Sequence, residues 1–94
     1  MDLNEQADKV NSKETFLEFV RALAADRADE VKLEKTLPSN PYGTGALGWE
    51  NGSIEAFLDA MQAWASAPAN KARVPEQPDW KTFAWILYAG KFYE

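Results

Sequence analysis

The 94-residue chain contains no cysteine and no histidine. Without thiols it can form no disulfide, no thiolate-held metal site and no cysteine nucleophile. Without imidazoles it lacks the usual general base at neutral pH, the Ser-His-Asp arrangement and His-bound zinc. Catalysis would have to rely on carboxylate, amine or hydroxyl groups alone. We therefore expect a protein that is not an enzyme and that uses no cofactor or metal.

Long hydrophobic runs are also missing. The longest apolar run covers residues 83–90, far short of the roughly 20 residues that a membrane span requires. The first residues lack the basic start and the apolar stretch of a secretory signal. These features predict a cytoplasmic protein with no membrane partner. Without export, the Asn51-Gly52-Ser53 sequon indicates a helix start rather than a glycosylation site.

Positive charge is scarce, with ten bases against fifteen acids and a net charge of −5. Residues 1–30 hold eight acids and four bases, and residues 49–66 hold three acids and no base. An acidic surface repels the phosphates of nucleic acids and attracts basic proteins. The charge balance therefore predicts a basic protein partner and no nucleic acid.

Aromatic residues are abundant, at 13 % of the chain with four tryptophans. A chain this short buries only about 60–65 % of its unfolded surface, so a few large rings can dominate the core. Apolar residues at helical spacing predict three helices, at about 12–28, 53–66 and 80–93. Their proposed starts are a capping box of Asn11 and Glu14, and N-caps at Ser53 and Asp79.

The predicted core faces follow from this spacing. On the first helix they comprise Phe16, Leu17, Val20, Leu23 and Ala24, and on the second Ile54, Phe57, Leu58, Met61, Trp64 and Ala65. The third helix is apolar on several faces, so it is either central or meets a partner. A strand at residues 83–93 is the alternative because aromatic residues favour sheets. Residues 29–37 fit either a short strand or a frayed helix end.

The predicted fold is mostly α, a small single-domain helical protein of about three main helices with long ordered loops. The composition predicts that residues 1–10 form a flexible acidic arm and that residues 11–94 form one helical domain. The loop at 38–48 contains Gly43-Thr44-Gly45-Ala46-Leu47-Gly48. This matches G-x-G-x-x-G in letters, but Pro38-Ser39-Asn40-Pro41-Tyr42 comes directly before it and Trp49-Glu50-Asn51-Gly52 delays the next helix. We therefore interpret it as a turn-rich loop rather than a dinucleotide site.

A candidate interaction surface combines acids near the second helix with aromatics of the third: Glu50, Glu55, Asp59, Trp85, Tyr88, Phe92 and Tyr93. The helix dipole explains Glu55 well and Asp59 less well, and no loop has the EF-hand spacing of a calcium site. We expect a non-catalytic protein-interaction module, which would also suit an immunity-like role, and a homodimer stays open. The alternative is a small-ligand binder with an aromatic pocket and Tyr88, Tyr93 or Glu50 as polar anchors.

Two segments carry a resemblance to a known family. They are Trp49-Glu50-Asn51 with Glu55-Ala56-Phe57-Leu58-Asp59-Ala60, and Trp80 with Phe83-Ala84 and Ile86-Leu87-Tyr88-Ala89-Gly90-Lys91-Phe92-Tyr93-Glu94. The chain resembles a family of small uncharacterised bacterial proteins, a domain of unknown function. The resemblance implies a small cytoplasmic chain but no catalytic residue, cofactor or partner. The family's acidic stretch after the second-helix tryptophan is replaced here by Ala65-Ser66-Ala67-Pro68-Ala69.

Overall fold

The protein was analysed as a computed structural model that describes residues 2–36 and 47–94. Its helices are α1 (Leu3–Asp8), α2 (Lys13–Thr36), α3 (Ile54–Ser66) and α4 (Trp80–Phe92), with a 3-10 turn η1 (Pro68–Asn70) before α4. The described residues contain no strand. The predicted mostly α, single-domain fold is thus confirmed. Most of the predicted 38–48 loop, including its first two glycines, lies outside the described residues.

The helix starts follow from capping side chains. The Ser53 hydroxyl accepts a hydrogen bond from the Ala56 N–H at 3.1 Å, and the Asp79 carboxylate accepts one from the Thr82 N–H at 2.9 Å. Both caps were predicted. At α2 the cap is Ser12, whose hydroxyl accepts from the Thr15 N–H at 3.1 Å. The predicted capping box of Asn11 and Glu14 is therefore wrong, because a serine one residue later supplies the acceptor.

Residues 29–36, which the sequence left open, are helical. α2 continues through them to Thr36. No proline or glycine interrupts the chain between Ser12 and Thr36, and Pro38 follows, which disfavours helical geometry in the residue before it. The short-strand alternative for this segment is wrong.

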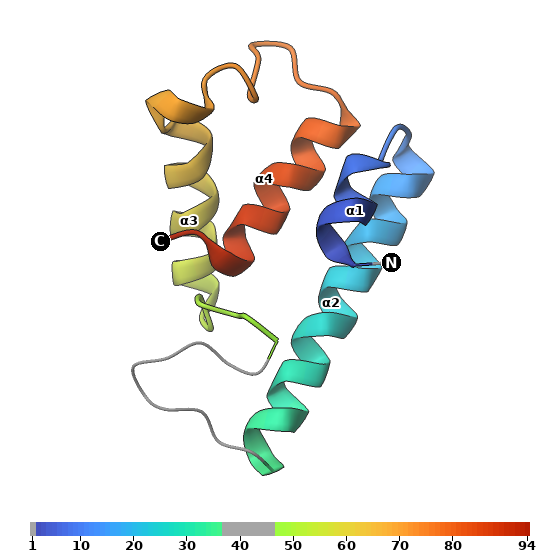
Figure 1. The fold of residues 1–94 in the computed structure, drawn as a ribbon, viewed down its shortest axis with the longest axis vertical. Helices are drawn as coiled ribbons and strands as arrows, with labels where there is room; N and C mark the ends of the chain where they lie inside the picture. Colours follow the sequence, from blue (N-terminus) through green and yellow to red (C-terminus); the bar gives the residue numbers. More distant parts are fainter. Residues whose placement is uncertain (1, 37–46) are drawn as a thin grey trace.

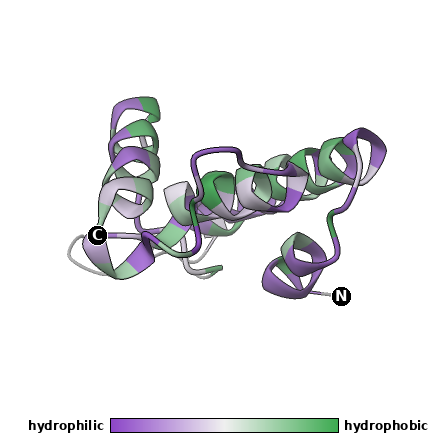
Figure 2. Cartoon of the chain, turned by 90° about the horizontal axis from the view of Figure 1, so that it is seen from above, coloured by the Kyte–Doolittle hydropathy of each residue, from purple (hydrophilic) through white to green (hydrophobic). Residues whose placement is uncertain are grey.

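Helix α1 occupies the segment predicted to be a flexible arm. Asp2 caps it by accepting from the Glu5 N–H at 3.0 Å. Ala7 is fully buried and Val10 is almost so, which places the segment in the core cluster rather than apart from the domain. The composition of α1 is mainly hydrophilic, as Figure 2 shows beside the N label. Ala7 and Val10 anchor this segment to the core. The sequence did not reveal this role because most of the neighbouring residues are polar.

Helix α4 is the central element. It lies between α2 and α3 (Figure 1), and α1 also packs against it. Its buried residues include Ala84 and Ala89, which face different neighbours. Its several apolar faces are explained by this position, and the strand alternative for residues 83–93 is wrong. At Gly90 an added Cβ would lie 2.7 Å from carbons of the Phe57 ring, so only glycine permits the close approach of α3 at this point.

Two of the predicted core faces are rotated relative to the structure. On α2, Phe19 is fully buried whereas Leu17 is 42 % exposed. On α3, Ala60 and Trp64 are buried, whereas Ile54 and Leu58 are 76 % and 55 % exposed. The predicted placement of Leu17, Ile54 and Leu58 in the core is wrong. Each helix carries more apolar surface than its neighbours cover, and spacing alone does not say which stripe is covered.

Candidate functional site

A set of side chains around Trp49 connects α2, α3, α4 and the segment that precedes α3. The Trp49 indole N–H donates to the Asp26 carboxylate at 2.8 Å, and the Lys91 ammonium donates to the same oxygen at 2.8 Å. The Phe57 ring stacks on Trp49 with 6.1 Å between ring centroids. The Lys91 side chain is 10 % exposed and that of Asp26 23 %. We call Asp26, Trp49, Asn51, Phe57 and Lys91 the Trp49 cluster.

Two cations lie over the Trp49 ring. The Arg27 guanidinium is 5.4 Å from the ring centroid and the Lys91 ammonium is 5.7 Å from it. Arg27 also donates to the Gly52 carbonyl at 3.2 Å. Such cation–π contacts contribute about 0.5–2 kcal/mol, more when water is excluded. They hold the segment before α3 against α2.

Asn51 closes the C-terminal end of α4. Its side-chain amide donates to the carbonyls of Gly90 and Tyr93, both at 3.0 Å. The Glu50 N–H donates to the Lys91 carbonyl at 2.9 Å. These bonds satisfy carbonyls that a helix end leaves without partners. Much of the segment that carries the family resemblance therefore has a structural role.

An apolar groove lies beside the Trp49 cluster, between α2 and the start of α3. It has a volume of about 330 Å³. Its apolar side chains are Val20, Leu23, Ala24, Trp49, Ile54, Phe57 and Leu87. Among the residues that the structure describes, Arg27 is the one charged residue that lines it. Leu58 lies one turn after Ile54, and Leu17 one turn before Val20, so both extend the same apolar stripes. We call this surface, with Leu17 and Leu58, the apolar groove.

The two walls of the groove differ in charge. On α3, Glu55 and Asp59 follow directly after Ile54 and Leu58, and both acids are exposed. α3 holds no basic residue. On α2, Lys13 and Arg21 lie one turn to either side of Leu17, and both are exposed. The α3 rim is therefore acidic, whereas the α2 rim carries both signs, because the exposed Glu18 follows directly after Leu17.

The structure separates the predicted interaction residues into three groups. Glu55 and Asp59 lie on the exposed side of α3. Trp85 and Tyr88 lie on the side of α4 that α1 covers, where the Trp85 N–H donates to Asp8 at 2.9 Å and Tyr88 meets Phe19 edge to face. Burial raises the pKa of Tyr88, with the charges of Asp2 and Asp26 adding to the effect.

The remaining predicted residues gather at the C-terminal end. The Phe92 ring lies 5.0 Å from that of Tyr88, and Tyr93 caps α4. A side-chain hydrogen bond with Glu94 raises the pKa of Glu50, and partial desolvation and the Glu94 charge act in the same direction. The predicted acids and aromatics therefore do not form one continuous surface.

The groove was missed because the sequence placed several of its residues in the core. Its one available signal was the excess of apolar stripes on the predicted helices. Within residues 2–36 and 47–94, no group of three acidic side chains is arranged to hold a metal ion. No helix in those same ranges is long and apolar enough to cross a membrane.

Comparison with known proteins gave one match. Residues 12–94 match the model of a family described as a family of unknown function (DUF7660). The matched range contains the Trp49 cluster and the apolar groove, whereas α1 precedes it. No curated protein and no solved structure matches the chain.

Proposed function

The chain belongs to the DUF7660 family, and we propose that it is a non-catalytic interaction module that binds an amphipathic segment of another protein in the apolar groove. The observation that carries the proposal is the exposure of Ile54 and Leu58 beside this groove. Contiguous exposed apolar surface on a small protein commonly marks an interaction site. Burying both side chains on binding would contribute about 1.5–3 kcal/mol each.

The charge of the rims supports a partner with a basic side. A helix that fills an apolar groove presents anchors at positions i, i+3 or i+4, and i+7. Lys or Arg next to those anchors would face Glu55 and Asp59 on the α3 rim. The net charge of −5 would speed the encounter with such a partner at low salt. This is the basic protein partner expected from the composition.

The polar groups of the groove support a binding role rather than catalysis. The Ser53 hydroxyl serves as the N-cap acceptor of α3, and Arg27 binds the Gly52 carbonyl. A general base or a nucleophile needs a free group within hydrogen-bond reach of the reacting atom. In the part of the chain that the structure describes, the groove lining offers no carboxylate or amine for that purpose.

The test compares three immobilised baits: the natural chain, Leu58→Arg and Ala63→Arg. Leu58 belongs to the groove, whereas Ala63 is an exposed position on another side of the same helix. We expect a protein from host lysate to bind the natural chain and Ala63→Arg but not Leu58→Arg, and to be lost at high salt because exposed charges are screened. Circular dichroism checks that both variants fold.

The retained protein is then purified and mapped by amide chemical shifts. Shifts centred on Val20, Ile54 and Leu87 are expected. Equal retention by Leu58→Arg and the natural chain would refute the groove as the binding site. A stable dimer that Leu58→Arg converts to monomer would assign the groove to self-association instead.

A further inference from the structure

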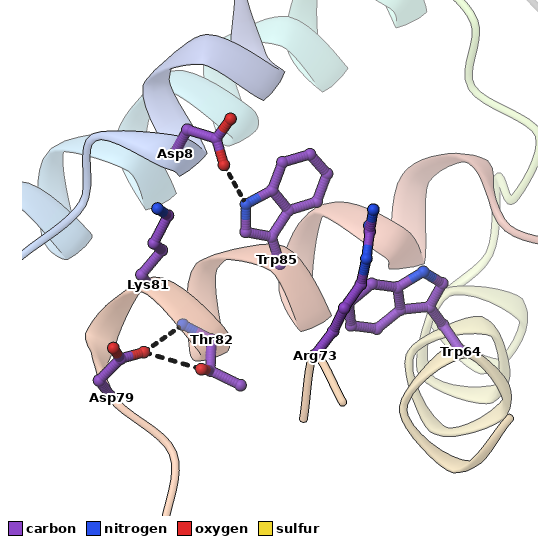
Figure 3. A pocket seen from close by; sticks show the side chains of 7 residues that line it. All are labelled: Asp8, Trp64, Arg73, Asp79, Lys81, Thr82 and Trp85. Carbon is purple, nitrogen blue, oxygen red and sulfur yellow. Dashed lines mark hydrogen bonds between the residues drawn. The ribbon is translucent and has the colours of Figure 1, made fainter. Parts of the chain in front are cut away.

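A second cavity, of about 400 Å³, lies near the start of α4, away from the apolar groove (Figure 3). Its aromatic side chains are Trp64 of α3 and Trp85 of α4. Trp64 is 5 % exposed and so is fixed by packing. The Trp85 indole is held by its hydrogen bond to Asp8 of α1. We call this cavity the Trp64–Trp85 pocket. A rigid, partly exposed indole such as that of Trp85 can stack on a planar ring.

The carboxylates of the pocket already have partners within the protein. Asp79 accepts from the Thr82 N–H at 2.9 Å and from its hydroxyl at 2.7 Å. These bonds lower the pKa of Asp79, and the nearby charge of Lys81 adds to the effect. Asp8 accepts from Trp85. The acidic groups are therefore used to build the walls and the start of α4.

Arg73 is the cation that remains available. It lines the pocket, and its guanidinium forms no hydrogen bond or ion pair with any residue that the structure describes. Its guanidinium offers a planar fork of donors that matches a carboxylate. Lys81, on the other side of the pocket in Figure 3, adds a second positive charge.

The backbone around Arg73 is fixed by the η1 turn. The Arg73 N–H donates to the Asn70 carbonyl at 2.9 Å, and the Val74 N–H donates to the same carbonyl at 3.2 Å. The Asn70 side chain in turn donates to the Trp64 carbonyl at 3.0 Å. Arg73 is thus positioned relative to the end of α3, and Figure 3 shows its side chain beside the Trp64 indole.

We propose that the Trp64–Trp85 pocket binds a small planar aromatic carboxylate. The ring stacks on the partly exposed Trp85 indole and contacts the small exposed part of Trp64. The carboxylate accepts hydrogen bonds from Arg73, with Lys81 close by. The volume falls within the range of small-molecule sites, which combine apolar walls with a few polar groups. This site is separate from the groove, and it includes Asp8, which precedes the residues that match the family.

The test titrates the full ¹⁵N-labelled chain with naphthalene-2-carboxylate and, separately, with the neutral naphthalene-2-carboxamide. The four tryptophans give four indole N–H signals, which single Trp→Phe variants assign. We expect the carboxylate to shift the signals of Trp64 and Trp85 saturably and to leave that of Trp49 in place. The carboxamide should bind about tenfold more weakly because it cannot form the charged pair.

Arg73→Gln should weaken carboxylate binding about tenfold, and Arg73→Lys should restore part of it. The matched control is Lys71→Gln, an exposed lysine two residues earlier that does not line the pocket, and it should bind as the natural chain does. Circular dichroism verifies that each variant folds. The proposal is overturned if millimolar carboxylate leaves both indole signals unchanged, if the carboxamide binds equally, or if Arg73→Gln matches Lys71→Gln. The groove variant Leu58→Arg should bind the probe normally, which keeps this test independent of the groove.

Discussion

Both sides of the layer formed by α2, α3 and α4 carry apolar side chains, but α1 covers only one of them. On the α1 side, Phe19 is fully buried against Tyr88, and Ala7 and Val10 complete the packing. On the groove side, Leu17, Ile54 and Leu58 are left between 42 % and 76 % exposed. The cover is a helix of only six residues. Apolar spacing thus identifies surfaces that can be buried, whereas the segments available to cover them decide which ones are.

The largest expected effect comes from comparing two alanine substitutions on α2, one at a buried position and one at an exposed position. Phe19→Ala should lower the free energy of unfolding by about 3–5 kcal/mol, because it empties a fully buried site. Leu17→Ala should cost less than about 1 kcal/mol, because that side chain is partly in water already. Urea unfolding of both variants measures the difference. Equal costs would show that the two sides are buried alike in solution.

The second-largest effect tests the Trp49 cluster, which connects α2 and α4 to the start of α3. Asp26→Ala should cost about 2–3 kcal/mol, because it leaves the Lys91 ammonium and the Trp49 N–H without their shared acceptor. Lys91→Met keeps most of the volume and removes the charge. In a double-mutant cycle, the combined variant should cost less than the sum of the two single variants. Additive costs would mean that the 2.8 Å pair contributes nothing in solution.

A smaller effect tests the contact between α1 and α4. Asp8→Ala removes the acceptor of the Trp85 N–H and should cost about 0.5–1.5 kcal/mol. The Trp85 indole signal should move toward its value in water, whereas Asn4→Ala, at another exposed position of α1, should leave it in place. An unchanged Trp85 signal in Asp8→Ala would show that the α1 contact does not persist in solution.

The smallest effect concerns the C-terminal edge. The pKa of Glu50 is raised above its usual 4.5 in the folded protein by its hydrogen bond with Glu94. The folded state therefore binds this proton more tightly than the unfolded chain does. Its stabilising contribution is present below the unfolded pKa and is lost as pH rises through the folded one.

Glu50→Gln should accordingly stabilise the protein slightly at pH 7 and not at pH 3. Thermal unfolding at both values measures this, with Glu55→Gln as the control on the exposed side of α3. A gain that is the same at both pH values would exclude the Glu50–Glu94 contact as its source.

Sequence reasoning recovered the elements whose signals are local. The caps at Ser53 and Asp79 lie next to the helices they start, and the three main helices follow from apolar spacing. The role of Asp26 could not be seen, because its partners Trp49 and Lys91 lie 23 and 65 residues away along the chain. Nothing distinguishes it locally from the other acids of residues 1–30. The groove depended on which stripe of α2 and α3 the core would use, and both stripes looked alike.

The central position of α4 also constrains how the chain is made. α1, α2 and α3 each pack on α4, and α4 comes after all of them in sequence. On a ribosome, the core therefore cannot close before residues 80–92 have been synthesised and have emerged. Until then the apolar stripes of α2 and α3 have no common partner, a condition in which nascent chains are prone to aggregate.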